Sequence, residues 1–118
     1  MRRRMMKSKI HRATVTGADV GYVGSISLDP LLMALADIAE HEQVQVLDVD
    51  NGARLETYAI AGRAGEVTIN GAAAHLVDPG HRVIVLTYAD YDHAELEGWR
   101  PVIVHVDGAN QPAAESAR

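Results

Sequence analysis

The residues most able to do chemistry begin with Ser25 and the glycine before it. Gly24 has no side chain to hinder attack on its carbonyl group, and glycine adopts backbone angles that other residues avoid. The Ser25 hydroxyl is the neighbouring nucleophile, so this peptide bond is a candidate for self-cleavage. Most Gly-Ser pairs form only a turn, and the rest of the chain has to decide between the two interpretations.

Tyr58, Arg54 and Lys9 supply further functional groups. A phenol ordinarily stays protonated at neutral pH, so Tyr58 is a candidate proton donor. Arg54 can hold a carboxylate through its bidentate fork, and Lys9 is a second cation that could do the same. The alternatives are a half-buried tyrosine on a strand and two ordinary surface charges.

Other kinds of site find no support in the spacing. There is no phosphate-binding glycine loop and no Ser-His-Asp arrangement. The chain has no cysteine, which excludes disulfides and thiolate ligands and suits a cytoplasmic protein. We expect no metal, because five histidines lack metal-ligand spacing and are expected on the surface or in packing: His41, His75, His81, His93 and His105.

Composition narrows the class of protein. A chain of 118 residues is enough for a single domain. Its formal net charge of −5 argues against nucleic-acid binding, and no stretch is long enough to span a membrane. Hydrophobic residues make up 47% but aromatic ones only 4%, so the core must consist of Val, Ile, Leu and Ala, which suit strands.

The elements expected to position these groups are mostly strands. A helix is expected to begin at Asp29 and Pro30 and to end near Glu40, and Asp50-Asn51-Gly52 predicts a tight turn between two strands. Residues 17–24 are expected to form turns, residues 70–75 a loop entering a helical turn, and residues 111–118 a fraying tail. Strands are expected over residues 5–16, 25–28, 44–49, 55–61, 66–69, 82–89 and 101–106. The pattern predicts a mainly β fold, a small β-barrel with helical insertions.

Five stretches of the chain resemble the bacterial L-aspartate 1-decarboxylase family. Their order and spacing carry the resemblance, which extends from about residue 5 to residue 110. The turn at residues 62–65 is shorter than in many relatives, and so is the C-terminal tail. The five stretches are KSKIHRATVT (residues 7–16), YVGS (22–25), NGAR (51–54), TYAI (57–60) and INGAAAH (69–75).

The resemblance implies a fold, an assembly and a reaction. The fold would be a double-psi β-barrel, and the protein a homotetramer with active sites between its subunits. The enzyme would convert L-aspartate to β-alanine and CO2, supplying pantothenate and coenzyme A synthesis.

The resemblance also implies that Ser25 is the precursor of a pyruvoyl cofactor, in place of pyridoxal phosphate. Ser25 Oγ would attack the Gly24 carbonyl and form an ester. Elimination would leave a carboxylate on Gly24 and a dehydroalanine at position 25, and hydrolysis with loss of ammonia would give the pyruvoyl group. That group would form a Schiff base with the substrate amine. The chain would then consist of fragments 1–24 and 25–118.

Each site residue takes its role from the same resemblance. Tyr58 would be the proton donor, while Thr57 and Asn70 would assist processing. Strand alternation places Thr57 on the opposite face from Arg54 and Tyr58, which a β-bulge or a site between subunits would resolve. The residues expected to bind substrate are Lys9, His11, Tyr22, Arg54, Thr57, Gly71, Ala72 and Ala73.

Two other functions stay open. The chain could be an inactive double-psi barrel that serves as a binding or assembly module. It could instead be a hydrolase in which Ser25 keeps its amine as an N-terminal nucleophile, although 118 residues are few for such a fold. Whether a maturation helper protein is needed also stays open.

Overall fold

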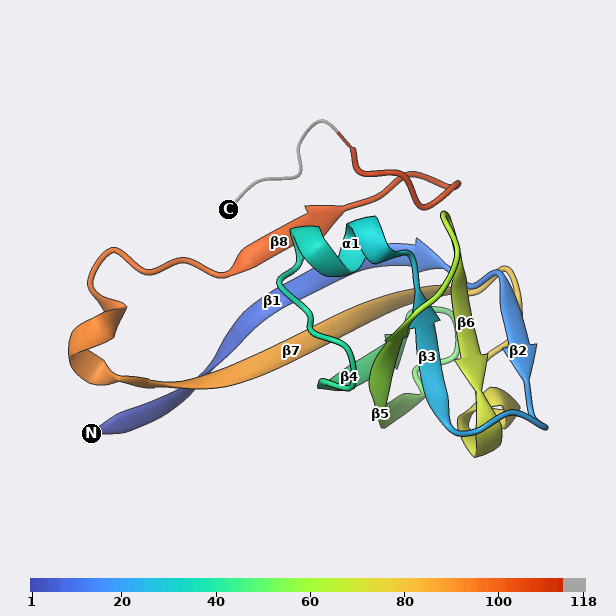
Figure 1. Ribbon diagram of the computed structural model, residues 1–118, viewed down its shortest axis with the longest axis horizontal. Helices are drawn as coiled ribbons and strands as arrows, with labels where there is room; N and C mark the ends of the chain where they lie inside the picture. The colour runs from blue at the N-terminus through green and yellow to red at the C-terminus, as the bar shows by residue number, and fades with distance from the viewer. Residues whose placement is uncertain (114–118) are drawn as a thin grey trace.

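The computed structural model describes residues 1–113 and consists mostly of strands (Figure 1). The helical segments are one α-helix, α1 (Pro30–Leu35), and two 3-10 helices, η1 (Gly71–His75) and η2 (His93–Leu96). The strands are β1 (Arg2–Thr14), β2 (Gly17–Asp19), β3 (Ser25–Leu28), β4 (Gln43–Asp48), β5 (Arg54–Ala61), β6 (Val67–Asn70), β7 (Arg82–Asp92) and β8 (Val102–His105).

The strands form a sheet that closes on itself. Its order is β2-β6-β3-β5-β4-β7-β1-β8, and β2 follows β1 after only two residues. Those two residues are themselves tied to neighbouring segments, because Val15 N donates to the His81 carbonyl (2.9 Å) and Thr16 N to the Val67 carbonyl (2.8 Å). The chain therefore pairs with β7 along β1 and with β6 along β2. This mainly β architecture with short helical insertions is consistent with a double-psi β-barrel, and the predicted fold class is confirmed.

The barrel interior has the expected composition. Along β4, Val44 and Val46 are buried while Gln43 is exposed, as strand alternation requires. The largest fully buried side chains are aliphatic ones, chiefly Ile, Leu and Val from β1, β3, α1, β4, β6 and β7. The sequence contains no Phe, so many small contacts of this kind replace aromatic packing.

Helix α1 begins as expected but is shorter than its apolar pattern suggested. The Asp29 carboxylate accepts from Leu31 N (2.8 Å), and Pro30 occupies the first turn. The helix ends at Leu35 because Asp37 has a φ of 55° and Ile38 N turns back to the Met33 carbonyl (2.8 Å). Ile38 still packs in the core, so its place in the apolar stripe reflected burial and not continued helix.

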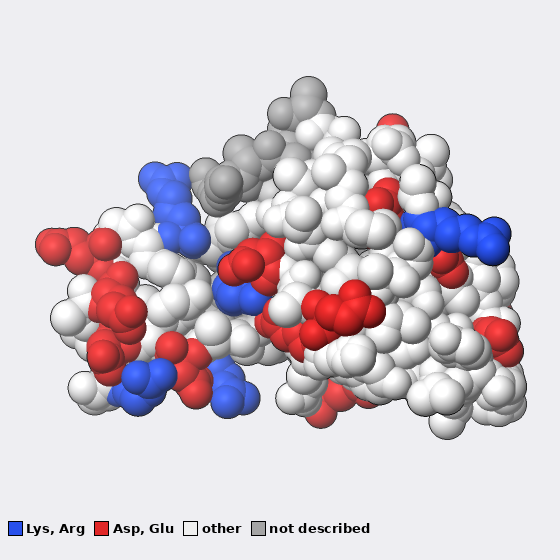
Figure 2. Space-filling model, viewed as in Figure 1, with Lys and Arg blue, Asp and Glu red and all other residues white. Residues whose placement is uncertain are grey.

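Strands β1 and β7 continue beyond the barrel as a two-stranded ribbon with η2 near its end, at the left of Figure 1. Both strands extend further into this ribbon than the sequence predicted. In the ribbon they are held by charged cross-strand pairs, which the apolar alternation used to predict strands does not reveal. Arg2 pairs with Asp92 (3.4 Å) and Arg4 with Asp90 (3.2 Å). Figure 2 shows acidic and basic side chains intermingled over this ribbon.

Two further expectations need correction. Residues 17–19 form β2, although the glycine-rich sequence suggested only turns. In the expected fraying tail, Pro112 forms a bridge with Val106 and Ala113 N donates to the His105 carbonyl (2.7 Å), while residues 114–118 lie outside the described part. Among residues 1–113, no helix is long and apolar enough to cross a membrane.

Candidate functional site

Ser25 lies at the start of β3 and is almost fully buried. It is paired with Asn70 in the antiparallel β3–β6 ladder. The Asn70 amide Nδ2 donates to Ser25 Oγ (3.0 Å) and to Ser27 Oγ (3.0 Å). Ser25 Oγ donates in turn to the Val23 carbonyl (3.1 Å). The hydroxyl is therefore held by two hydrogen bonds directly beside the Gly24–Ser25 peptide.

The start of η1 packs against that peptide from the other side. Gly71 has a φ of +76°, and a Cβ there would lie 2.6 Å from Gly24 Cα and 2.8 Å from Gly24 N. Such distances leave no room for a side chain, so position 71 needs glycine for both its backbone angle and its close approach. Ala72 and Ala73 follow within η1. Tyr22, whose carbonyl would lie 3.3 Å from the same Cβ, has an exposed side chain.

Tyr58 lies next to Ser25 across the parallel β3–β5 ladder. Ile26 is paired with Ala59, so one residue earlier on each strand Ser25 is level with Tyr58. Residues level with each other on neighbouring strands point to the same face, which places the Tyr58 and Ser25 side chains on one side of the sheet. Within residues 1–113, the ring of Tyr58 contacts His41 edge-on (5.9 Å between centroids), and no residue hydrogen-bonds to its hydroxyl.

Thr57 is level with Gly24 by the same register, but its side chain faces away from Tyr58. The β4–β5 register is regular over its whole length, so the bulge suggested for this strand is wrong. Arg54 and Tyr58 share one face of β5 and Thr57 the other. A site that takes residues from two subunits stays a prediction.

Lys9 and Arg54 are not neighbours within one chain. Lys9 is paired with Leu86 on β7 and Ile103 on β8, whereas Arg54 is the first residue of β5. Strands β7 and β4 lie between them, which corresponds to about 14 Å across a sheet. Within one chain, Lys9 and Arg54 therefore extend from the two ends of a four-strand stretch of the sheet.

His11 also lies apart from Ser25. It is paired with His105 on β8, and the two rings meet edge-on (5.4 Å between centroids). Its Nδ1 is buried and has no hydrogen-bond partner in the described chain. Burial lowers the pKa of His11, and the positive charges of Lys9, His105 and Arg12 lower it further. The imidazole is therefore neutral near pH 7.

A shallow groove opens beside the buried serine pair. Its lining includes Ser27 and Asn70 as well as Tyr22. Ser27 was missed as a member of the site, although the alternation Ser25-Ile26-Ser27 already places both hydroxyls on one face. Arg63 contributes a cation to the same groove and was likewise not singled out.

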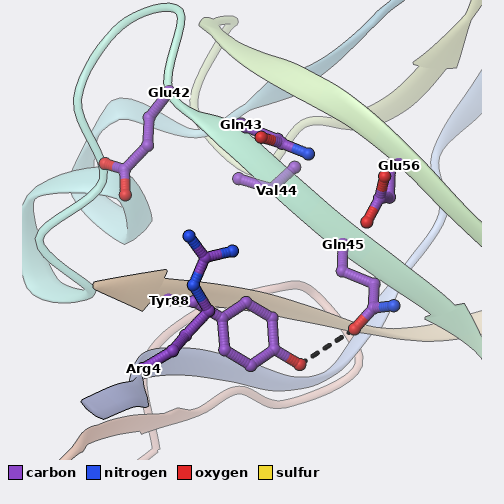
Figure 3. Close-up of a pocket in the computed structure, with 7 residues that line it drawn as sticks. All are labelled: Arg4, Glu42, Gln43, Val44, Gln45, Glu56 and Tyr88. Atoms are coloured by element: carbon purple, nitrogen blue, oxygen red, sulfur yellow. Dashed lines mark hydrogen bonds between the residues drawn. The ribbon is translucent and has the colours of Figure 1, made fainter. Parts of the chain in front are cut away.

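A second hollow lies over the outer face of the β4–β5 hairpin (Figure 3). Its volume of about 190 Å³ is smaller than that of typical small-molecule sites, and none of the predicted site residues lines it. Tyr88 donates from its hydroxyl to Gln45 Oε1 (2.9 Å), and the Arg4 side chain extends toward β4. We therefore place the candidate site at Ser25 and not here.

His81 is not the simple surface or packing residue that was expected. Its ring and the carboxylates of Asp48 and Asp50 offer atoms within 4.8 Å of one another. These groups already bond within the chain: His81 Nδ1 lies 2.6 Å from Asp48 Oδ2, Asp50 N donates to Asp48 Oδ1 (2.8 Å), and Arg82 N to Asp50 Oδ2 (2.7 Å). The three residues are thus hydrogen-bonded to one another or to the neighbouring backbone.

Comparison with known families agrees with the geometry around Ser25. The family model described as aspartate decarboxylase matches residues 1–113, nearly the whole chain. That match supports decarboxylation of aspartate as the reaction. With a buried Ser25 beside Gly24, and Tyr58 level with it on the next strand, the chain belongs to the aspartate decarboxylase family.

Proposed function

We propose that the protein is a pyruvoyl-dependent aspartate 1-decarboxylase that converts L-aspartate to β-alanine and CO2 for pantothenate synthesis. The observation that carries the proposal is the Ser25 hydroxyl, which is buried and held by Asn70 beside a peptide that Gly71 packs against. A cytoplasmic location is part of the proposal and suits a chain without cysteine.

The residues present fit a pyruvoyl group at position 25. Gly24 is exposed, and a Cβ built on it would meet no other atom within 4 Å, so the residue before Ser25 lies in open surroundings. In the proposed maturation, Ser25 Oγ bonds to the Gly24 carbonyl carbon as the peptide C–N bond breaks. Loss of the Ser25 Cα proton with cleavage of the Ser25 Cβ–Oγ bond then releases the Gly24 carboxylate and leaves a dehydroalanine. Water replaces its nitrogen, which leaves as ammonia. The domain would thus become fragments 1–24 and 25–118.

In turnover, the pyruvoyl carbonyl would supply the electron sink that decarboxylation needs. Tyr58, level with position 25, would donate the proton that replaces CO2 on the substrate Cα. Arg54, on the same strand, would bind a substrate carboxylate. Its backbone lies about 13 Å along β5 from that of Tyr58, and its long side chain can extend over part of that distance. Gly71, Ala72 and Ala73 would let the backbone approach the substrate closely.

The site would be completed by a second subunit of a homotetramer. Lys9 and His11 lie on β1, far from Ser25 within one chain, yet the resemblance assigns both to the substrate pocket. A neighbouring subunit could bring them to Ser25 and Tyr58. Tyr22, exposed beside Gly24, would lie at that junction.

Intact mass spectrometry of the purified protein tests the proposal directly. We expect two fragments, 1–24 and 25–118, the larger one lighter by one ammonia than a fragment that starts with serine. Ser25→Ala should remain uncut. A wild-type chain that stays whole on prolonged incubation would favour the inactive binding module, and a cut chain with a free serine amine would favour the N-terminal nucleophile hydrolase.

Tyr58→Phe separates maturation from turnover. The variant should cut itself but lose β-alanine production by about a hundredfold or more, because it keeps the ring and lacks the acidic proton. Tyr88→Phe is the matched control, since the Tyr88 hydroxyl bonds to Gln45 away from Ser25. Normal β-alanine production by Tyr58→Phe, measured by amino-acid chromatography, would show the proton-donor assignment to be wrong.

A further inference from the structure

The pair formed by Asp48 and His81 ties two loops of the candidate site together. Asp48 ends β4, and its side chain is fully buried, whereas His81 directly precedes β7 and is partly exposed. The two groups are 2.6 Å apart at Asp48 Oδ2 and His81 Nδ1. Because an ionised carboxylate only accepts hydrogen bonds, His81 Nδ1 is the donor.

The same carboxylate organises the turn that leads into Arg54. Asp48 Oδ1 accepts from Asp50 N (2.8 Å) and Asn51 N (3.3 Å). The Asn51 side chain then bonds in two directions, accepting from Ala53 N (2.8 Å) and donating from Nδ2 to the Leu76 carbonyl (2.8 Å). Residue 53 immediately precedes Arg54. Residue 76 caps η1, the element that begins at Gly71 beside Gly24.

We infer that Asp48 and His81 are positioning residues for the decarboxylation, which fix the Asn51–Gly52 turn against the end of η1 and thereby set Arg54 relative to the Gly71–Ala73 backbone. The inference rests on the proposed role of Arg54 as a carboxylate ligand. Neither residue touches the substrate. Each acts by holding the short connection from which Arg54 extends.

The charge on His81 matters to this connection. The hydrogen bond to Asp48 raises the pKa of His81, and the charges of Asp48, Asp50 and Asp78 raise it further, while burial opposes them. Below that raised pKa, the imidazolium offsets these carboxylates. Above it, His81 can keep its Nδ1 hydrogen but loses the charge, so the turn is held less firmly as pH rises.

Asp48→Asn should reverse this pH dependence. The amide Oδ1 can still accept from the turn amides, but Nδ2 now donates toward His81 Nδ1, which accepts only when the imidazole is neutral. The wild-type KM for aspartate should therefore rise with pH through the His81 titration. The KM of Asp48→Asn should instead fall with rising pH, through a His81 titration that lies lower because the Asp48 carboxylate no longer raises this pKa. A general loss of structure would not produce opposite slopes.

The closing experiment compares wild type, Asp48→Asn and His81→Gln with His93→Gln, an exposed histidine on the distant ribbon. For His81→Gln we expect a KM about tenfold higher with kcat changed less than about twofold, and weaker binding of succinate, a dicarboxylate without an amine, in calorimetry. Amide hydrogen exchange should accelerate at residues 49–54 and 71–76 only.

Either of two kinetic results would overturn the inference: unchanged KM and succinate affinity in His81→Gln, or parallel pH slopes for wild type and Asp48→Asn. Failure of the proposed function would look different, because wild type itself would then make no β-alanine. The exchange measurement would still decide whether the pair holds the turn. Unchanged exchange at residues 49–54 would show that it does not.

Discussion

At the residue scale, Asn70 is the side chain on which the geometry of Ser25 depends. One amide nitrogen serves two hydroxyls, those of Ser25 and Ser27, and all three groups are buried. A buried polar group that loses its partner costs about 1–3 kcal/mol, so the three residues stabilise one another as a unit. Without Asn70, the Ser25 hydroxyl would keep only its hydrogen bond to the Val23 carbonyl.

Asn70→Ala should therefore slow self-cleavage by about tenfold or more, because Ser25 Oγ loses the contact that orients it. Ser27→Ala is the matched control: it removes the second acceptor and leaves the Asn70–Ser25 bond in place. The measurement is the fraction of cut chain against time after purification, by intact mass. Equal cleavage rates for Asn70→Ala and wild type would contradict an orienting role.

The sequence identified most of the chemical groups but not all their neighbours. Gly24, Ser25, Tyr58 and Asn70 were named in advance. The structure brings Ser25, Tyr58 and Asn70 together on β3, β5 and β6, with Gly24 directly before β3. The hydrogen bond between Asp48 and His81 had no signal in the spacing. Those residues are 33 positions apart and meet only because the β6–β7 connection returns to the β4–β5 turn.

At the element scale, η1 positions the candidate site through its first residue. A 3-10 helix usually serves as a short connector, but this one begins with a left-handed glycine pressed against Gly24. The small residues of its first turn leave the backbone accessible. The approach of η1 to β3 thus constrains where the Gly24–Ser25 peptide can lie.

Gly71→Ala tests this approach. Its positive φ should cost about 1–2 kcal/mol, and the added Cβ should also displace Gly24 and stop self-cleavage. Gly80→Ala is a matched control with a φ of +92° and open space around the new Cβ, so it should carry the backbone cost alone. Urea unfolding and intact mass measure the two effects. Complete cleavage in Gly71→Ala would mean that η1 does not constrain the peptide.

The elements were predictable to the extent that local patterns decided them. Alternation located β3, β4, β5 and β6 within a residue or two, and Asp50-Asn51-Gly52 correctly predicted the β4–β5 hairpin. The outer halves of β1 and β7 were underestimated, because they are stabilised by pairing with each other and not by burial. β2 was missed for a similar reason, since it is a strand only through its pairing with β6.

At the scale of the whole molecule, the separation of Lys9 from Arg54 points to an assembled site. β7 and β4 lie between the two residues, while Ser25 and Tyr58 are side by side in one chain. Two inactive variants, Lys9→Ala and Tyr58→Phe, should therefore complement each other. After mixed reassembly, about a quarter of the sites would combine an intact Lys9 with an intact Tyr58.

The measurement is β-alanine formation by the coexpressed variants, with each variant alone as the baseline and size-exclusion light scattering to follow the tetramer. The control mixes two variants on the same strand, Arg54→Ala and Tyr58→Phe, which one chain contributes together under our proposal and which should not complement. Recovery in neither mixture would mean that Lys9 does not act across a subunit boundary.

The closure of the barrel has one more consequence, for the protein after cleavage. Fragment 1–24 would contain β1 and β2, the continuous segment that pairs with β7 on one side and with β6 on the other. Removing that segment would open the barrel and expose its aliphatic interior to water. The two fragments should thus stay associated as a single particle in native buffer and separate only in denaturant, because pairing between their strands holds them together without a peptide bond.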